Sequence, residues 1–450
     1  MRRAPLLLVV ALGCACAWPA LARADDLVQV YREAQQNDPV LASARATWTA
    51  TQERVPQARA GLLPTVNGTG SANVNAQRTE VQTTPTVAGS EVFLNYGATI
   101  SASQPLFRLQ NVAVFKEAGQ QVVQADYVLA SAQQDLILRV AQAYFDVLLA
   151  QFTVELSESQ KAAVSEQLAQ AKRNFEVGVS TITDTNEAQA RYDTIQAQEI
   201  AARNDLDNKM TALRVIIGHA PGELKRLGPG FEPALPEPND PEYWAGRALN
   251  ENYAVRIARA NLAIATLEVE RARAAHYPTV DAVASVGLNG ATGGVSSGGV
   301  ASNADVRGRN AILGLQVAVP IYQGGAVESR VREAIAQEDR SRQDLETNRR
   351  NALFLAQTGF SGVTSAAASI KAFEQALVSA QSAYESNRLG LEVGVRTTLD
   401  VLNVQQTVFQ TRRDLAQAYF NYLVGLLRLK AAVGALTDAD LEDVNRRLAG

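Results

Sequence analysis

Few residues in this 450-residue chain could carry out covalent or metal chemistry. The two histidines, His219 and His276, do not stand in the spacing of a metal-ligand motif, and no Ser-His-Asp or Cys-His arrangement is apparent. No G-x-x-x-x-G-K loop, which would hold nucleotide phosphates, occurs either. We therefore expect neither an enzyme nor a protein with a cofactor or a metal site, and we interpret both histidines as structural.

The N-terminal residues predict export. Two arginines precede an uncharged apolar stretch, and Ala22-Arg23-Ala24 forms a small-x-small cleavage site. This order is typical of a secretory signal peptide, here residues 1–24, and the alternative is the start of a buried helix. Both cysteines, Cys14 and Cys16, lie inside this segment, so the mature chain would contain no disulfide. A weak likeness of Leu12-Gly13-Cys14 to a lipoprotein cleavage box leaves lipidation of Cys14 open.

Composition excludes several other classes of protein. Hydrophobic residues make up 47% of the chain and charged residues 20%, which argues against a disordered protein and against a helical protein with many membrane spans. Beyond the N-terminus we find no apolar run near the roughly 20 residues of a spanning helix. The net charge is −4, with no cluster of lysine and arginine, so we expect no nucleic acid partner.

The chain consists of one unit repeated twice. Three landmarks recur in the same order at a nearly constant offset of about 215 residues, as expected for a tandem duplication. They are Gln57–Val66 with Arg271–Val280, Gln104–Phe107 with Val319–Tyr322, and Glu176–Val179 with Glu392–Val395. Residues 219–240 form a proline- and glycine-rich linker between the units. We expect a first repeat at 25–218, a second at 241–434 and a C-terminal tail at 435–450.

The sequence of each repeat predicts the same order of elements: a helix, a strand, a loop, a strand, a very long helix, a short break and a last helix. Good helix formers dominate the helical parts, and no proline interrupts either long segment. The expected helices are Leu27–Gly61, Asn111–Phe175 and Thr181–Ile217, then Tyr243–His276, Ala326–Leu391 and Thr397–Val433. A helix of about 65 residues is about 100 Å long, so such helices must pack side by side as coiled coils.

Four segments alternate between apolar and small polar residues, which places one kind of side chain on each face of a strand. They lie at 65–75, 92–103, 280–289 and 310–319. In the first, Val66, Gly68 and Gly70 alternate with Asn67 and Thr69. Each segment is close to the roughly 9–11 residues that cross a bilayer as a tilted strand, and such alternation is typical of a barrel wall around water. The alternative is four half-buried strands of a soluble sheet.

Four strands cannot close a membrane barrel alone. In lipid every backbone polar group must be paired, so an open sheet edge is not tolerated, and the smallest common barrels have about eight strands. Two copies would give eight strands with an interior filled by side chains, and three would give twelve with more room inside. We expect an oligomer and favour three copies. Ala76–Glu91 and Gly290–Gly308, rich in Thr, Gly and Ser, are predicted to be exposed outer loops.

Two regions carry a family signature. The residues that match the signature are densest at Val177–Asp184, Ala190–Thr194 and Ala202–Asn208 in the first repeat and at Val393–Leu402 in the second. With these stretches the chain resembles the TolC family of outer-membrane factors over essentially its whole mature length, and more closely TolC than the lipid-anchored multidrug members. The resemblance implies an α+β membrane protein, in which a trimeric twelve-stranded outer-membrane β-barrel, with four strands per chain, is continued by a long periplasmic α-helical coiled-coil barrel.

The resemblance also implies a function. Members of this family are passive exit ducts of the cell outer membrane that extend into the periplasm and serve drug efflux, type I protein secretion or both. They work as homotrimers with a periplasmic adaptor protein and an inner-membrane efflux pump or ABC exporter. The linker and the tail would form a small equatorial region. The rival hypothesis is a pore-less periplasmic coiled-coil protein with a structural or adhesin-like role, which the long helices fit but the four alternating strands do not.

The resemblance places docking residues at the ends of the helical hairpins. The turns Val177-Gly178-Val179 and Val393-Gly394-Val395 would be the periplasmic tips that meet the adaptor. Glycine permits a sharp turn between two helices, so the alternative is that both segments are only turns.

The resemblance further implies a constriction near these tips, made by a ring of acids and by links between helices. Asp400 matches a ring acid, and clustered carboxylates attract cations, whereas Asn403 stands where a second acid is usual. Without the resemblance, Asp400 is an ordinary acid at a helix start. Gate-linking positions are matched by Arg396, Thr183 and Asp184, and Leu391 replaces a linking tyrosine. We expect weaker block by cations and easier opening.

Overall fold

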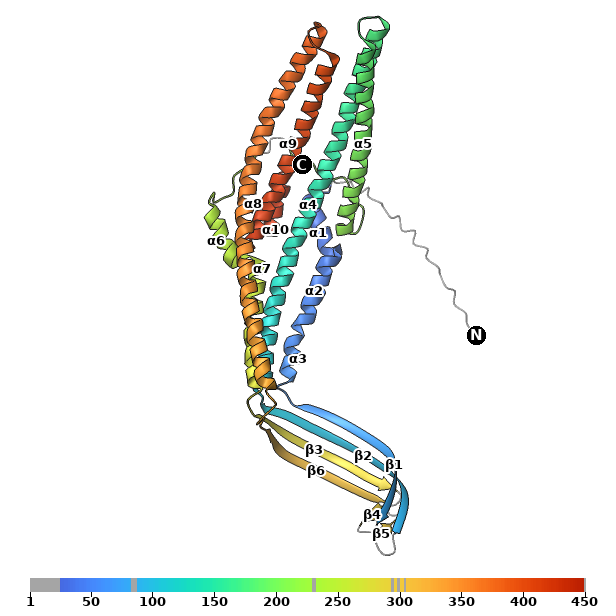
Figure 1. The fold of residues 1–450 in the computed structure, drawn as a ribbon, viewed down its shortest axis with the longest axis vertical. Helices are drawn as coiled ribbons and strands as arrows, with labels where there is room; N and C mark the ends of the chain where they lie inside the picture. Colours follow the sequence, from blue (N-terminus) through green and yellow to red (C-terminus); the bar gives the residue numbers. More distant parts are fainter. Residues whose placement is uncertain are drawn as a thin grey trace, which may run out of the picture.

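The computed structural model describes residues 25–81, 87–228, 232–292, 295–297, 300–302 and 305–448. The predicted signal peptide, residues 1–24, lies outside the described residues. The molecule is long and narrow, with a β-sheet at one end and two pairs of long helices that reach the other end (Figure 1). Helices α6 (Pro241–Glu251) and α10 (Asp438–Asn445) lie beside the middle of the helical part.

The first helical segment of each repeat contains breaks that we did not predict. Leu27–Gly61 is divided into three helices and Tyr243–His276 into two, with Asp38 and Asn252 capping the helices that follow them. Pro39 follows Asp38 at once, so the first of these breaks also has a steric cause. The other helices are α1 (Leu27–Asn37), α2 (Pro39–Gln52), α3 (Arg54–Ala60), α4 (Leu109–Glu176), α5 (Ile182–Ile217), α7 (Tyr253–Ala274), α8 (Ala326–Glu392) and α9 (Thr398–Ala432).

Two helical hairpins form the long axis of the molecule. Helix α4 packs against α5, and α8 packs against α9, while α7 contacts both α4 and α8 (Figure 1). With 68 and 67 residues, α4 and α8 are each about 100 Å long. Buried alanines such as Ala113, Ala118 and Ala125 recur along α4, and their small side chains let neighbouring helices approach closely.

The main hydrophobic core lies where the middle of both hairpins meets α1, α6 and α10. Tyr144 and Phe145 of α4 are buried here, and the Phe145 ring stacks on that of Phe420 in α9, with 5.5 Å between ring centroids. The Tyr144 hydroxyl donates a hydrogen bond to the backbone carbonyl of Lys225 at 2.8 Å. This bond ties the linker to the core of the hairpins.

Our expectation of no spanning-length apolar run was wrong for one window of α4. An 18-residue stretch of this helix is apolar enough, by length and composition, to cross a membrane, with a mean hydropathy of 1.2. The protein itself buries 44% of that window. Apolar side chains of α4 such as Leu136, Val140 and Val147 belong to the main core. Helix packing therefore accounts for apolar residues on several sides of this helix.

Four long strands form one antiparallel sheet, and two short strands form a separate hairpin. The sheet order is β1 (Thr65–Val81), β2 (Val87–Phe107), β3 (Thr279–Thr292) and β6 (Val306–Ala318), and the hairpin consists of β4 (Val295–Ser297) and β5 (Val300–Ser302). Both predicted outer loops are therefore largely strand. Their polar composition suggested loops, but main-chain pairing does not require apolar side chains, and the pair Arg78–Ser90 continues the ladder.

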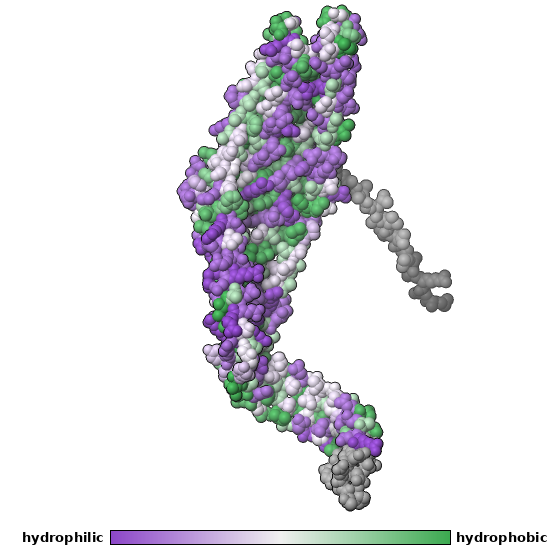
Figure 2. Space-filling view, viewed as in Figure 1, coloured by the Kyte–Doolittle hydropathy of each residue, from purple (hydrophilic) through white to green (hydrophobic). Residues whose placement is uncertain are grey.

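The register of the sheet gathers the apolar residues on one face. Val66 pairs with Ala102, Ile100 with Val286, and Ala284 with Leu313, so one apolar face runs across all four strands. Its side chains are exposed in the isolated chain, with Leu313 at 87%. Asn67, Ser101 and Ser285 form a row on the opposite face, where Ile312 is an apolar exception. Figure 2 shows hydrophobic surface where the sheet meets the helices.

The two outer strands leave the sheet open. Within the described residues, β1 and β6 each pair on one side only, which leaves a row of backbone N–H and C=O groups without partners. The sheet has an even number of strands, so β1 and β6 run in opposite directions. The β6 edge of one copy can therefore extend the β1 edge of another copy as an antiparallel neighbour.

The two long helices join the sheet differently. At the start of α4, Arg108 donates to Asp281 of β3 through Nε at 2.8 Å and through Nη2 at 2.5 Å, and Asp281 is buried. Such a bidentate pair fixes the orientation of both groups. The segment between β6 and α8 instead contains Gly324 and Gly325, both left-handed with φ values of 64° and 79°. Ahead of them Ile321 is 94% exposed.

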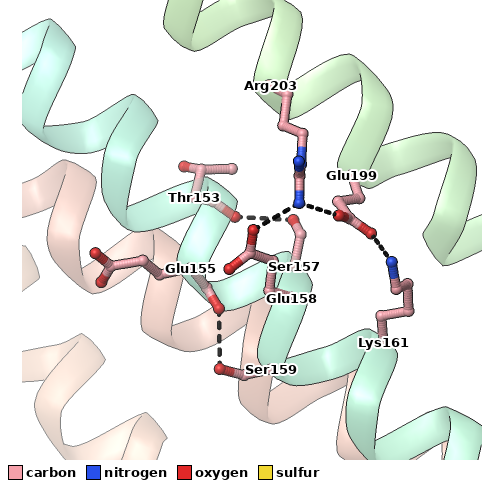
Figure 3. Close-up of polar contacts among 8 residues, drawn as sticks. All are labelled: Thr153, Glu155, Ser157, Glu158, Ser159, Lys161, Glu199 and Arg203. Carbon is pink, nitrogen blue, oxygen red and sulfur yellow. Dashed lines mark hydrogen bonds and ion pairs between the residues drawn. The ribbon is translucent and has the colours of Figure 1, made fainter.

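A buried carboxylate lies between α4 and α5 (Figure 3). Glu199 of α5 is 5% exposed, accepts a hydrogen bond from Lys161 Nζ at 2.5 Å and lies 2.7 Å from Arg203 Nη2. Arg203 also contacts the exposed Glu158 at 2.8 Å. The bond from Lys161, followed by the charges of Lys161 and Arg203, lowers the pKa of Glu199 below its ordinary value despite burial. The carboxylate is therefore ionised at neutral pH.

The second hairpin has a different interior at the matching height. Counted back from the Val-Gly-Val turns, the positions of Lys161 and Glu199 are occupied by Leu377 and Leu415. The position of Arg203 is occupied by Tyr419, whose hydroxyl donates to Glu374 at 2.5 Å. Two half-buried leucines thus stand where the first hairpin has an ion pair. Such replacement is often neutral for stability, whereas the removal of one partner is not.

We predict that Glu199→Gln lowers the thermal unfolding midpoint by several degrees at neutral pH, because Lys161 and Arg203 lose their buried anion. Folding lowers the pKa of Glu199, so its charge stabilises the folded state above the pKa of an unfolded glutamate, about 4.3. This stabilisation disappears as the pH falls through the lower folded pKa. Melting curves from pH 7 to pH 3 measure the effect. Glu158→Gln, at an exposed partner of Arg203, is the control. A difference in unfolding midpoint between wild type and Glu199→Gln that is as large at pH 3 as at pH 7 would contradict the prediction.

Candidate functional site: the tips of the two helical hairpins

The two hairpins end in the same backbone turn. Gly178 and Gly394 adopt the left-handed conformation, with φ values of 77° and 80°. In each turn the second valine, Val179 or Val395, donates its N–H to a carbonyl of the last helical turn at 2.9 Å. These bonds satisfy carbonyl groups that the helix end leaves without partners. Glycine is required at both turns because residues with a side chain rarely adopt this conformation.

Both tips expose apolar side chains. The valines that flank the glycines are exposed at Val177 (72%), Val179 (73%), Val393 (67%) and Val395 (75%). Figure 2 shows hydrophobic surface at the ends of both hairpins, above helices that are largely hydrophilic on this face. Single exposed valines are common on protein surfaces, but here the same group of exposed valines recurs at both tips.

Each returning helix begins with the same capping box. The Asp184 carboxylate accepts bonds from the N–H and the hydroxyl of Thr181, both at 2.9 Å, and the Asp184 N–H donates to that hydroxyl at 3.3 Å. Asp400 and Thr397 repeat the arrangement at 3.0, 2.9 and 3.2 Å. Reciprocal bonds of this kind satisfy the free N–H groups at a helix start. Both acids therefore have a local structural role.

Asp400 is held in its ionised form. The backbone N–H and then the hydroxyl of Thr397 donate hydrogen bonds to its carboxylate, and Arg396 lies close by. These interactions lower the pKa of Asp400 below its ordinary value, because they favour the charged form. The side chain is half-buried at the start of α9. A negative charge is therefore present at this tip at neutral pH.

The structure brings three of the predicted gate residues to one cavity. A cavity of about 590 Å³ lies between the two tips and is lined by Asp184 from one hairpin and by Leu391 and Arg396 from the other. Thr183 is exposed and does not line it. Asp400 and Asn403 do not line it either, although Asp400 is at the same helix end. The six positions are thus near one another but do not form a single contact group.

Arg396 packs against its own hairpin. A side chain at Gly390 would bring its Cβ within 2.7 Å of Arg396 Cγ, so this glycine makes room for the arginine. Among the described residues, no hydrogen bond or ion pair joins Arg396 to Thr183 or Asp184. The matching residue of the first tip is Ser180, which is too short to cross between tips.

Arg191 forms a link between the hairpins that we did not predict. From α5 its guanidinium donates through Nη1 to Gln406 at 2.6 Å and through Nη2 to Asn403 at 2.9 Å, both on α9. Its stretch of sequence was noted only as part of the family signature. The partners lie more than 200 residues away, at |i−j| = 215 and 212, and depend on how two hairpins meet, so local spacing gives no signal for them.

An apolar contact accompanies this polar link. Leu402 of α9 is 2% exposed and packs with Val164 of α4 and Ile195 of α5, with the partly buried Tyr192 beside them. Near the tips, the second hairpin thus contacts the first through this buried leucine and through the Arg191 fork, among other contacts of α9 with α4 and α5.

Comparisons with known proteins agree with this arrangement. The sequence model of outer membrane efflux proteins matches two segments of the chain, residues 30–219 and 244–435. The outer membrane protein TolC of Vibrio cholerae is 33% identical over 448 residues, which cover 99% of this chain and 98% of the relative. The proteases secretion protein PrtF of Dickeya chrysanthemi is 31% identical, over 98% of this chain and 94% of the relative.

A solved structure shows the same fold. The CmeC outer membrane channel of Campylobacter jejuni superposes with a TM-score of 0.77 and covers 99% of this chain and 98% of its own, at 14% identity. The predicted fold class, the outer-membrane location and the family resemblance are confirmed. The relatives are transport proteins and not an enzyme family. With matches in both halves and a full-length relative above 30% identity, the chain belongs to the outer membrane efflux protein family.

Proposed function

We propose that three copies of this chain form a passive exit duct for drug efflux, type I protein secretion or both. The observation that carries the proposal is the four-stranded sheet, which has an exposed apolar face, a small polar face and two open edges. Three sheets joined edge to edge give twelve strands, enough for a water-filled interior, whereas eight strands are filled by side chains. The hairpins continue the wall away from the sheet.

The duct needs partners, because the sequence has no nucleotide-binding loop to drive transport. We propose a periplasmic adaptor that docks at the tips and an inner-membrane efflux pump or ABC exporter behind it. The exposed valines Val177, Val179, Val393 and Val395 with the glycines Gly178 and Gly394 supply an apolar docking surface. The relative named for protease secretion supports protein cargo, and the match to the sequence model of outer membrane efflux proteins supports efflux.

We further propose that the chain is organised as two repeats, 25–218 and 241–434, with equatorial parts at 219–240 and 435–450. The repeated turn and capping box at both tips support this division, as do the two separate family matches. Within the described residues, Leu227 of the linker pairs with Leu448 of the tail beside the main core.

The proposal predicts ion conduction. Mature protein reconstituted in planar lipid bilayers should give discrete conductance steps, because a closed ring of strands encloses water. The measurement is single-channel current under an applied voltage, with liposomes lacking protein as the control. The rival function, a pore-less coiled-coil scaffold with a structural or adhesin-like role, would leave the bilayer silent.

We propose that Asp400 forms a constriction, with three carboxylates around the axis of the duct. Asp400→Asn keeps an oxygen that can accept the capping bonds of Thr397 but removes the charge. Block of the channel by a trivalent cation should then weaken by roughly tenfold or more, because charge rings concentrate counterions. The measurement is the blocking concentration in single-channel recordings.

Asp440→Asn is the matched control for this change, since Asp440 has the same capping role at the start of α10, away from the tips. Its block by the trivalent cation should stay at the wild-type value. Equal effects of both substitutions would remove Asp400 from the constriction. The residues Arg396, Thr183, Asp184 and Leu391 remain in our proposal as positions that link the tips in the closed state, with Asn403 as an uncharged ring position.

Arg191 should hold the duct closed, because its guanidinium joins α5 to α9 near the tips. Arg191→Ala removes two hydrogen bonds, a loss of roughly 1–2 kcal/mol, and should raise the open fraction several-fold. The readout is basal conductance without adaptor. Lys172→Ala is the matched control, since Lys172 bonds Gln189 within the first hairpin only. An unchanged open fraction in Arg191→Ala would show that this link does not restrain the tips.

A further inference from the structure

One row of side chains on β6 changes from apolar to basic. From the helix end outward it carries Val317, Leu315, Leu313 and Ala311, and then Arg309 and Arg307. Arg309 pairs with Leu288 and Arg307 with Gly290, so the register places both arginines on the apolar face of the sheet. Both are exposed, and neither takes part in any hydrogen bond or ion pair given for the described residues.

The height of these arginines matches the outer border of a membrane. Arg309 and Arg307 lie nine and eleven residues from Ala318, the helix-side end of β6. At about 3.3 Å per residue and a tilt of about 40°, these positions are roughly 23 and 28 Å along the membrane normal. The apolar band of such barrels is about 25 Å tall. Charge costs little there, whereas it costs about 2–4 kcal/mol at the midplane.

An aromatic side chain marks the same height on the same face. Tyr96 of β2 pairs with Gly290, which in turn pairs with Arg307. A Cβ at Gly290 would lie only 2.4 Å from the Tyr96 ring, so the ring lies over this glycine. Tyrosine is enriched where the apolar band meets the headgroups. Tyr96 and the two arginines thus place the same border independently.

We propose that Arg307 and Arg309 bind the phosphate groups of an anionic lipid in the outer leaflet. A guanidinium matches phosphate with two parallel hydrogen bonds, and two arginines on one face can contact two phosphates or one phosphate from both sides. The apolar row below them, from Ala311 to Val317, contacts the acyl chains of the same lipid. β6 is an outer strand of the sheet.

This arrangement favours a lipid over a soluble anion. The arginines stand on the exposed apolar face, where Leu313 is 87% and Leu315 69% exposed. A soluble phosphate has no apolar part to contact these leucines, whereas a lipid has acyl chains. A carboxylate of a neighbouring copy is the competing partner, since β6 is an open edge. The inference depends on the outer-membrane location and on contact between the apolar face of the sheet and lipid. It does not depend on the constriction that we propose at the hairpin tips.

The test uses the purified mature protein in mild detergent. Wild type and the double variant Arg307→Gln/Arg309→Gln are titrated with lipid A that carries two phosphates, with the same lipid after removal of its phosphates, and with inorganic phosphate alone. Native mass spectrometry measures the bound lipid. We expect wild type to prefer the phosphorylated lipid, and we expect the double variant to bind it about tenfold more weakly or worse. Inorganic phosphate should not compete.

Arg330→Gln/Arg332→Gln is the matched control, because these exposed arginines are also two residues apart but lie on α8. It should bind the phosphorylated lipid as wild type does. Equal binding of that lipid by wild type and Arg307→Gln/Arg309→Gln would overturn the proposal, and so would displacement by inorganic phosphate. Assemblies of the double variant that dissociate more readily in the absence of lipid would assign the arginines to a neighbouring copy and also overturn it. Conductance of this variant is recorded separately, so failure of the lipid site is distinguished from failure of the duct.

Discussion

The requirement that backbone hydrogen-bonding groups be paired in lipid governs this structure. One chain supplies four strands whose outer members, β1 and β6, have one free edge each among the described residues. An edge of this kind costs several kcal/mol per unpaired group in hydrocarbon, so the sheet is stable in a membrane only beside further copies. The opposite directions of β1 and β6 allow such copies to join in the antiparallel sense, and the hairpins follow the symmetry that the strands impose.

Much of this fold could be predicted from the sequence, because apolar residues recur at helical spacing in some segments and at every second position in others. Alternation in segments such as 92–103 predicted which residues share a sheet face, and the register of Ile100 with Val286 agrees with it. The extent of the ladder was underestimated, since the polar residues near Arg78 resemble a loop although their backbone is paired. The breaks at Asp38 and Asn252 were missed because a single cap inside a helical pattern is a weak signal.

The candidate site was predictable only in part, for a related reason. Val-Gly-Val turns and capping boxes are local, and their residues stand within a few positions of one another, so the sequence displays them. The Arg191 fork joins partners on separate hairpins, and the cavity between the tips depends on how far the hairpins diverge. The ring role that we propose for Asp400 cannot be tested in the structure of one chain, because it requires three copies around an axis.

The unequal junctions between sheet and helices have a mechanical consequence. At the start of α4, Arg108 donates two hydrogen bonds to Asp281 of β3, and this pair fixes the helix to the sheet. At the root of α8 two consecutive left-handed glycines, Gly324 and Gly325, provide a joint in which torsion meets little resistance. Farther along, α7 and the main core hold α4 and α8 together, so this freedom stays local to the junction. The sheet can therefore change its tilt against α8 more easily than against α4.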